Sequence, residues 1–236
     1  MFILKKDFAK IKYLIVNNQI FLPVNLIKVF FFIFLTFVKC HFLYIKYLNM
    51  KNIIVFASGS GTNAEKIIRH FNFSNFAKVS YIASNKPDAF VLRRAEMLNV
   101  KTLTFNKNDL YTYNKVLDFL LNENPDIIVL SGFLLLMPSN IISAFPKRII
   151  NIHPALLPEY GGKGMYGDNV HKAVLADKKN ESGITIHYVN EKYDDGDIIF
   201  QKSCPVYPDD TVSSLAEKIH ALEYEFFPKV IESLII

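Results

Sequence analysis

Apolar residues follow two alternating patterns along most of the chain. Ile53 to Phe56 is a short continuous run, which is typical of a strand covered on both faces of a sheet. A helical spacing follows it, at Ala64, Ile67, Ile68 and Phe71. Because this strand–helix order repeats, the pattern predicts right-handed crossovers and an α/β fold with an open, doubly wound, mostly parallel Rossmann-like sheet.

The same patterns predict the remaining elements. We expect strands at residues 79–83, 101–105, 126–130, 149–152, 183–189 and 198–206. We expect helices at residues 89–98, 109–122, 138–145, 170–176 and 212–227, the last one capped by Asp209-Asp210-Thr211. The final two strands alternate in polarity and are not separated by a helix, so they predict an antiparallel C-terminal extension of the sheet.

The turn after the first strand is rich in glycine and reads Gly59-Ser60-Gly61-Thr62-Asn63. A helix N-terminus beside free backbone N–H groups favours an anion. Gly59 and Gly61 permit a tight turn, and Thr62 and Asn63 are suitable as helix caps and as polar donors. The turn has neither the P-loop lysine nor the third glycine of the dinucleotide fingerprint. A plain turn and a phosphate cradle are both consistent with it.

Polar side chains also cluster near the end of the strand at residues 149–152. Asn151 and His153 point the same way, because side chains alternate along a strand, and Pro154 ends the ladder. Ligands bind at the carboxyl ends of strands in open α/β sheets. The acidic turn from Asp194 to Asp197 adds a carboxylate, although an aspartate in a turn is often only a turn former. The apolar run from Leu134 to Met137 is either core or the wall of a site for a flat aromatic ligand.

The first 49 residues differ from the rest of the chain. They contain seven lysines and one acidic residue, Asp7, which leaves 20 basic and 21 acidic residues elsewhere. The remainder therefore shows no charge signature of a nucleic-acid surface. The apolar stretch from Val29 to Val38 is shorter than the roughly 20 residues of a membrane span. We interpret residues 1–49 as an extension outside the native fold, either a misassigned start before Met50 or a short anchor, and residues 50–236 as the domain.

Taken together, the ordered motifs resemble one family. These motifs are the glycine turn, Asn151-Ile152-His153-Pro154, Leu156-Leu157-Pro158, Gly183-Ile184-Thr185-Ile186-His187 and Asp194-Asp195-Gly196. From Met50 to nearly the C-terminus the chain is similar to the folate-dependent phosphoribosylglycinamide formyltransferases. That resemblance implies transfer of a formyl group from 10-formyltetrahydrofolate to the amino group of 5-phosphoribosylglycinamide, the third step of de novo purine synthesis, without a metal.

The resemblance also assigns residues. The catalytic positions are Asn151, His153 and Asp194. The ribonucleotide would be held by Gly59, Ser60, Gly61, Thr62, Asn63 and Glu223. The folate would contact Leu134, Leu135, Leu136, Met137, Asn151, Asn190 and Asp194. Several relatives touch the folate with an arginine after the third strand, where this chain reads Asn106-Lys107-Asn108-Asp109. The Gly161–Asp168 loop is longer than in the shorter bacterial members.

This assignment leaves rival functions to be tested. A formyltetrahydrofolate deformylase would use water as the acceptor and would carry a regulatory domain in front. A methionyl-tRNA formyltransferase would carry a basic RNA-binding domain behind, and sugar-nucleotide formyltransferases usually lack the glycine turn. A degenerate folate- or nucleotide-binding protein is the non-enzymatic alternative. We expect two small-molecule substrates, no nucleic acid, no membrane partner for the domain, a cytoplasmic location, and either a monomer or a homodimer.

Overall fold

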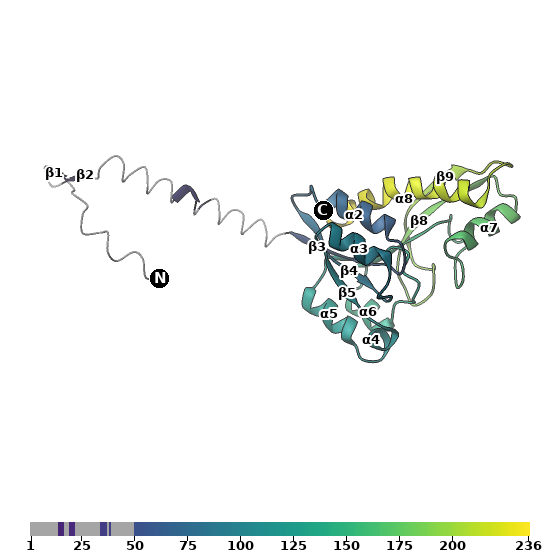
Figure 1. The fold of residues 1–236 in the computed structure, drawn as a ribbon, viewed down its shortest axis with the longest axis horizontal. Coiled ribbons are helices and arrows are strands. Elements are labelled where there is room, and N and C mark those ends of the chain that lie inside the picture. The colour runs from purple at the N-terminus through teal and green to yellow at the C-terminus, as the bar shows by residue number, and fades with distance from the viewer. Residues whose placement is uncertain (1–13, 17–18, 22–33, 37, 39–49) are drawn as a thin grey trace. The chain divides into compact units, whose positions relative to one another are not determined.

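The computed structural model describes residues 14–16, 19–21, 34–36, 38 and 50–236 (Figure 1). The chain divides after Asn49 into two units, each described here by itself. In the first, β1 (Leu14–Val16) pairs antiparallel with β2 (Gln19–Phe21). Most of this segment lies outside the described residues, so its interpretation as an extension stays a prediction. Among the described residues, no helix has the length and apolar character needed to cross a membrane.

Residues 50–236 form a seven-stranded sheet with the order β5-β4-β3-β6-β7-β8-β9. Strands β3 to β7 pair in parallel, and β8 and β9 add antiparallel pairs at one edge. This arrangement confirms the predicted fold class. The strands are β3 (Lys51–Phe56), β4 (Ala77–Ser84), β5 (Lys101–Thr104), β6 (Ile127–Leu130), β7 (Ile149–His153), β8 (Glu181–Tyr188) and β9 (Ile198–Pro205).

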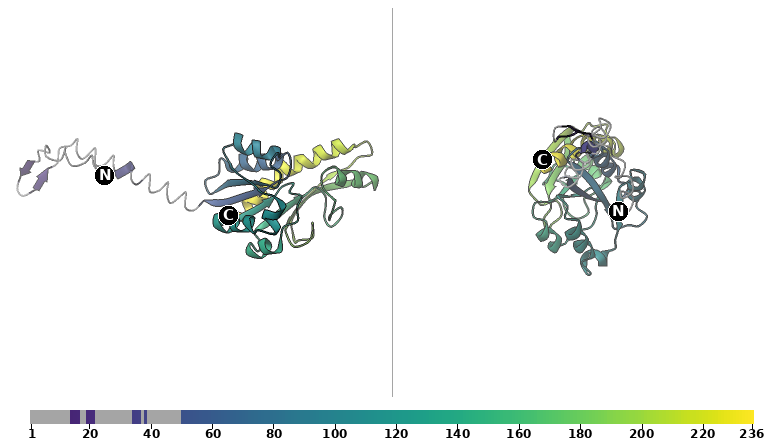
Figure 2. Two further views of the ribbon diagram at one scale, coloured as in Figure 1. Left: turned by 60° about the horizontal axis from the view of Figure 1, so that its bottom comes forward. Right: turned by 90° about the vertical axis from the view of Figure 1, so that its left-hand side faces the viewer.

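Helices cover both faces of this sheet (Figure 2). One core holds the apolar sides of α2 (Thr62–Phe71), α3 (Phe90–Met97), α7 (Asp168–Ala176) and α8 (Val212–Ile235). The other holds those of α4 (Lys107–Tyr111), α5 (Lys115–Glu123) and α6 (Ser139–Ala144). Strand β3 feeds both, because Ile53 and Val55 face the first core and Ile54 and Phe56 face the second. This double burial explains its continuous apolar run.

Two predicted helix boundaries were wrong. The single helix expected at residues 109–122 is two helices, α4 and α5, which break before Asn114 because that residue has a left-handed backbone (φ 54°). The last helix begins after the predicted cap Thr211 but continues through Pro228 to Ile235. It continues because Val230, Ile231 and Ile235 are buried, and this packing outweighs the hydrogen bond that a proline removes.

The start of α2 also differs from the prediction, since neither Thr62 nor Asn63 caps it. Gly61 is the N-cap, with a left-handed backbone (φ 74°) and no side-chain cap bond. The turn packs against α3, where the backbone N–H of Val91 donates to the carbonyl of Gly59 (3.1 Å). A Cβ on Gly61 would lie 2.2 Å from Val91 Cγ2, whereas a Cβ on Gly59 would meet nothing within 4 Å. Only Gly61 is therefore required by both conformation and packing.

This difference predicts that alanine at Gly61 and alanine at Gly59 lower the free energy of unfolding by unequal amounts. Gly61→Ala should destabilise the domain by about 2–4 kcal/mol, from the left-handed backbone together with the collision with Val91. Gly59→Ala should leave stability within about 0.5 kcal/mol of the wild type. Urea denaturation of both variants measures the difference. Equal stability of the two variants would contradict this account of the turn.

Candidate active site

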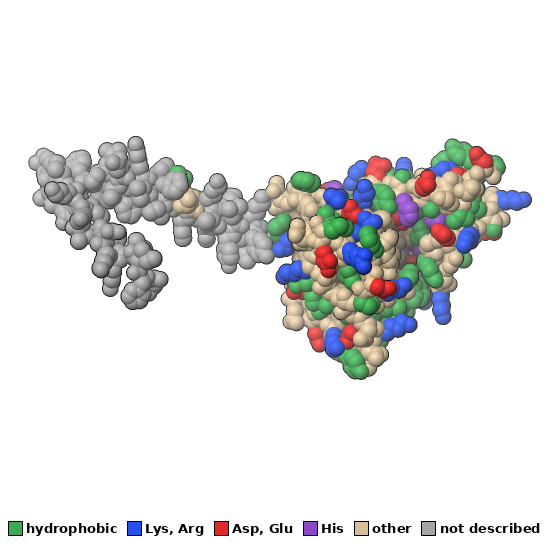
Figure 3. Space-filling view, viewed as in Figure 1, with side chains coloured by type: hydrophobic (Ala, Val, Ile, Leu, Met, Phe, Trp, Pro, Cys, Tyr) green, Lys and Arg blue, Asp and Glu red, His purple; other side chains and the backbone are tan. Residues whose placement is uncertain are grey.

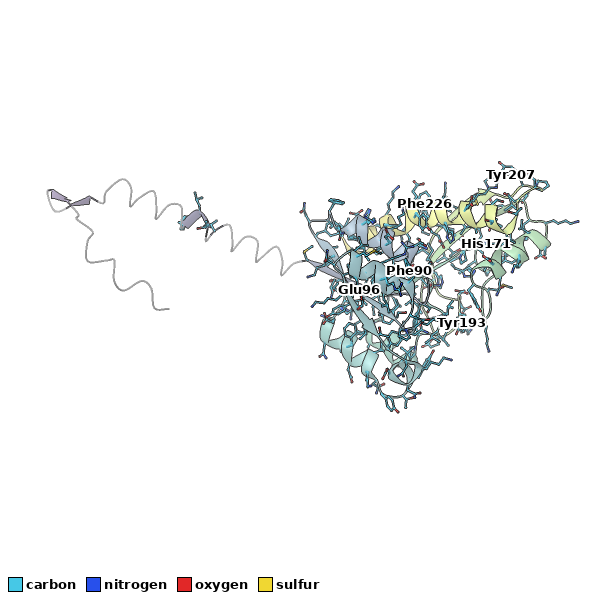
Figure 4. All side chains as sticks on the ribbon, in the orientation of Figure 1. Phe90, Glu96, His171, Tyr193, Tyr207 and Phe226 are labelled. Carbon is cyan, nitrogen blue, oxygen red and sulfur yellow. The ribbon has the colours of Figure 1, made fainter. Side chains whose placement is uncertain are left out.

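One cavity of about 640 Å³ opens beside the carboxyl ends of β3, β6 and β7. Its lining joins segments that are distant in sequence: the turn at residues 59–63, the apolar run at residues 134–137, and the end of β7. Figure 4 labels two other lining residues, His171 on α7 and Tyr193 in the turn before β9. In Figure 3, histidine side chains (purple) are visible on the surface in the region where Figure 1 places α7 and α8. The cavity lies where ligands bind in open α/β sheets.

Asn151, His153 and Asp194 meet at one side of this cavity. Asn151 Nδ2 lies 3.3 Å from Asp194 Oδ1, and His153 Nδ1 lies 3.4 Å from Asp194 Oδ2. β7 supplies the first two side chains, and the turn between β8 and β9 supplies the third. The side chains of His153 and Asp194 are only 2% and 10% exposed, so they interact in surroundings of low polarity.

His187 is a fourth member of this cluster, which the sequence analysis did not identify. Its Nδ1 lies 2.8 Å from the carbonyl oxygen of Tyr188, and its Nε2 lies 3.1 Å from Asn151 Nδ2. A carbonyl only accepts hydrogen bonds, so Nδ1 carries the proton and Nε2 of the neutral ring accepts from Asn151. Both N–H bonds of the Asn151 amide are therefore held, one by His187 and one by Asp194. The antiparallel register that pairs Asn151 with His187 creates this contact.

A backbone carbonyl also orients the ring of His153, but through the other ring nitrogen. Its Nε2 lies 2.7 Å from the carbonyl oxygen of Tyr160 and must donate to it. Nδ1 is then the nitrogen that faces Asp194, and it is the one that can gain or release a proton without breaking the Tyr160 bond.

Asp194 is held as a carboxylate. Burial raises its pKa, but the His153 ring and the backbone N–H of Gly162, which donates to Oδ2 (3.0 Å), outweigh burial. The pKa of Asp194 therefore lies well below its usual range, and the site carries a fixed negative charge at neutral pH.

The other end of the cavity combines the N-terminus of α2 with a buried carboxylate on α8. Glu223 is 5% exposed. Its Oε2 accepts from Asn63 Nδ2 (2.8 Å) and lies 2.9 Å from His220 Nδ1. The bond with Glu223 raises the pKa of His220, which favours the imidazolium here. This end offers backbone donors, a carboxylate and a titratable cation.

The apolar wall is fixed to the glycine turn by side-chain bonds. The N–H of Leu134 donates to Ser58 Oγ (3.1 Å), and Tyr111 Oη donates to the carbonyl of Leu136 (2.8 Å). Leu134, Leu135, Leu136 and Met137 all line the cavity. One buried serine thus links the wall to the strand end that carries the turn.

Some expected folate contacts lie elsewhere. Asn190 does not line the cavity, and its side chain lies 3.3 Å from Asp195, although Lys192 and Tyr193 do line it. The segment at residues 106–109 forms the capping box of α4 and is not part of the lining. His171 and His220 line the cavity without having been predicted. Among the described residues, no group of three or more side chains is arranged to hold a metal ion.

Comparison with known proteins agrees with this architecture. The family model described as Formyl transferase matches residues 51–231. Phosphoribosylglycinamide formyltransferase of Haemophilus influenzae is 34% identical over 188 residues, which cover 78% of this chain and 86% of that protein. The chloroplastic phosphoribosylglycinamide formyltransferase of Arabidopsis thaliana is 38% identical over 192 residues, 78% of this chain, and the chain spans 65% of its length.

Solved structures give the same result. The crystal structure of glycinamide ribonucleotide transformylase 1 from Geobacillus kaustophilus aligns with a TM-score of 0.72 and 34% identity, covering 79% of this chain and 100% of that chain. Phosphoribosylglycinamide formyltransferase from Streptococcus pneumoniae aligns with a TM-score of 0.70 and 32% identity, again over 79% of this chain and 100% of that one. The chain belongs to the formyl transferase family, and within it to the phosphoribosylglycinamide formyltransferases.

The lowered pKa of Asp194 predicts how stability depends on acid. A carboxyl group with a folded pKa below its unfolded value of about 3.9 stabilises fully above that value, and the contribution is lost as the pH falls toward the folded pKa. The free energy of unfolding of the wild type should therefore fall more steeply between about pH 5 and pH 3 than that of Asp194→Asn. Urea denaturation across that range measures both slopes. Parallel curves would contradict the assignment.

Proposed function

We propose that this chain transfers the formyl group of 10-formyltetrahydrofolate to the amino group of 5-phosphoribosylglycinamide, giving the formylated ribonucleotide and tetrahydrofolate in purine synthesis. The observation that carries the proposal is the convergence of Asn151, His153 and Asp194 in one cavity with the glycine turn and the apolar wall. The named relatives support it. The proposal includes a cytoplasmic enzyme with two small-molecule substrates and no nucleic-acid partner, and it leaves monomer or homodimer open.

The two ends of the cavity suit the two substrates. The ribonucleotide phosphate would lie on the backbone donors of residues 59–63 at the start of α2, which favours negative charge. Glu223 would accept hydrogen bonds from the rest of the ribonucleotide. The folate ring would lie against Leu134 to Met137, a surface suited to a flat aromatic ligand. The reacting amine and formyl carbon would then meet beside the polar cluster.

The reaction needs charge stabilisation and proton movement. Attack of the neutral amine on the formyl carbon forms a tetrahedral oxyanion, and hydrogen-bond donors aimed at such an oxygen typically contribute about 3–4 kcal/mol each. Asn151 would supply one donor by exchanging its bond to His187 or Asp194 for a bond to the oxyanion. The amine must lose a proton and the folate nitrogen must gain one as the C–N bond breaks. We assign this transfer to His153 Nδ1, with Asp194 stabilising the charged ring.

Removing either reactive side chain should stop most turnover. His153→Ala or Asp194→Asn should lower kcat by about 10²- to 10³-fold, the usual loss for one group that acts on developing charge. The matched control is Asp195→Asn, which removes the adjacent carboxylate. The Asp195 side chain is 52% exposed, so this variant should keep kcat within about twofold of the wild type. Near-normal kcat in either active-site variant would contradict the assigned roles.

The assay itself separates the possible activities. Wild-type protein is incubated with 10-formyltetrahydrofolate, with and without 5-phosphoribosylglycinamide, and formylated ribonucleotide and free formate are measured by mass spectrometry. The proposal expects formylated product that depends on the ribonucleotide. Formate release that does not depend on the ribonucleotide would indicate a deformylase, and substrate binding without either product would indicate a degenerate binding protein.

A further inference from the structure

The ring of His153 is held between two residues with unusual backbones. Tyr160 and Asp194 both have left-handed conformations, with φ of 56° and 55°. Such a conformation is unfavourable in a residue other than glycine and persists only where surrounding contacts impose it. The carbonyl of Tyr160 contacts Nε2 of His153, and the carboxylate of Asp194 faces Nδ1. Strain is therefore concentrated on both sides of one imidazole.

The chain after Tyr160 is packed against the same cluster. A Cβ on Gly161 would lie 2.6 Å from Leu157 Cδ2 and 3.2 Å from Asp194 Cβ, so this position is closely packed against the turn that carries Asp194. The next residue, Gly162, donates its N–H to Asp194 Oδ2. The backbone of this segment thus contacts His153 through the carbonyl of Tyr160 and Asp194 through the N–H of Gly162.

The side chain of Tyr160 provides the contact that holds this backbone in place. Its hydroxyl donates to Asp177 Oδ2 (2.8 Å), and Asp177 is the C-cap of α7. The ring packs against the core beneath α7 and α8. Burial, with the Asp177 bond, raises the pKa of Tyr160 to about 12, so the hydroxyl remains a donor over the working pH range.

We propose that Tyr160 is a positioning residue for His153. Its hydroxyl bond to Asp177 holds the strained backbone, and the backbone carbonyl holds a proton of His153 on Nε2. Nδ1, which faces the Asp194 carboxylate, is then the nitrogen that carries the transferred proton. This inference rests on the proposed function only in assigning proton transfer to His153. The tautomer it requires is a property of the protein without substrates.

The experiment compares variants that differ by single polar groups. Tyr160→Phe and Asp177→Ala each remove the bond, while Asp177→Asn keeps a side-chain oxygen that accepts from the hydroxyl. We expect Tyr160→Phe and Asp177→Ala each to lower kcat about tenfold, with both KM values within about twofold of the wild type. Asp177→Asn should keep kcat within about threefold of the wild type. The double variant Tyr160→Phe/Asp177→Ala should be no slower than either single variant, because both changes remove the same bond. Tyr207→Phe removes a hydroxyl from an exposed tyrosine on another loop and should have no effect.

A second measurement reads the tautomer directly. Nitrogen-15 NMR of the His153 ring should show the Nε2–H form in the wild type and a mixture of tautomers in Tyr160→Phe, with the thermal unfolding curve confirming that the variant is folded. The proposal would be overturned by a normal kcat in folded Tyr160→Phe, or by a change in KM alone. It would equally be overturned if Asp177→Asn were as slow as Asp177→Ala, or if the His153 tautomer were unchanged in Tyr160→Phe. If the wild type forms no formylated ribonucleotide, the proposed function fails, and the NMR comparison still decides the role of Tyr160.

Discussion

The antiparallel pairing of β7 with β8 is the constraint on which the candidate site depends. Its register sets Asn151 opposite His187 and returns the chain so that the turn before β9 carries Asp194 over the end of β7. A shift of one residue would turn every side chain of β8 to the opposite face of the sheet. Ile184 and Ile186 are fully buried in one core, and Thr185 and His187 are buried on the opposite face, so such a shift would move polar side chains into the core. The hydrophobic core therefore fixes the geometry of the polar cluster.

Within that frame, electrostatics determines which groups carry charge. Asp194 accepts hydrogen bonds from Asn151 and from the backbone N–H of Gly162 and faces the His153 ring, and these contacts stabilise its ionised form despite burial. At the opposite end, Glu223 shares one oxygen between Asn63 and His220. Each buried carboxylate is therefore matched by hydrogen-bond donors from another element, as buried charges require.

Local patterns predicted much of this molecule. The parallel strands, the glycine turn and the shared direction of Asn151 and His153 follow from apolar runs and strand alternation, both of which are visible within a few residues. The break at Asn114 depends on a backbone conformation with no periodic signal. The roles of His187, His220 and Tyr160 depend on strand register, on helix packing and on one carbonyl, which bring together residues far apart in the chain. The family resemblance indicated Glu223 and Asp194, and residue spacing alone did not.

The two ends of the cavity are also linked by side-chain hydrogen bonds. Ser58 accepts from the N–H of Leu134 and donates to Asn85, so the strand that leads into the glycine turn also fixes the start of the apolar wall. Asn63 then ties the same turn to α8 through Glu223. A displacement of the turn would therefore move both the apolar wall and the Glu223 end of the cavity relative to β7. Reacting atoms must be held to within about half an ångström for efficient attack. The close packing of Gly61 against Val91 fixes the turn, and through these hydrogen bonds it also fixes the two ends of the cavity.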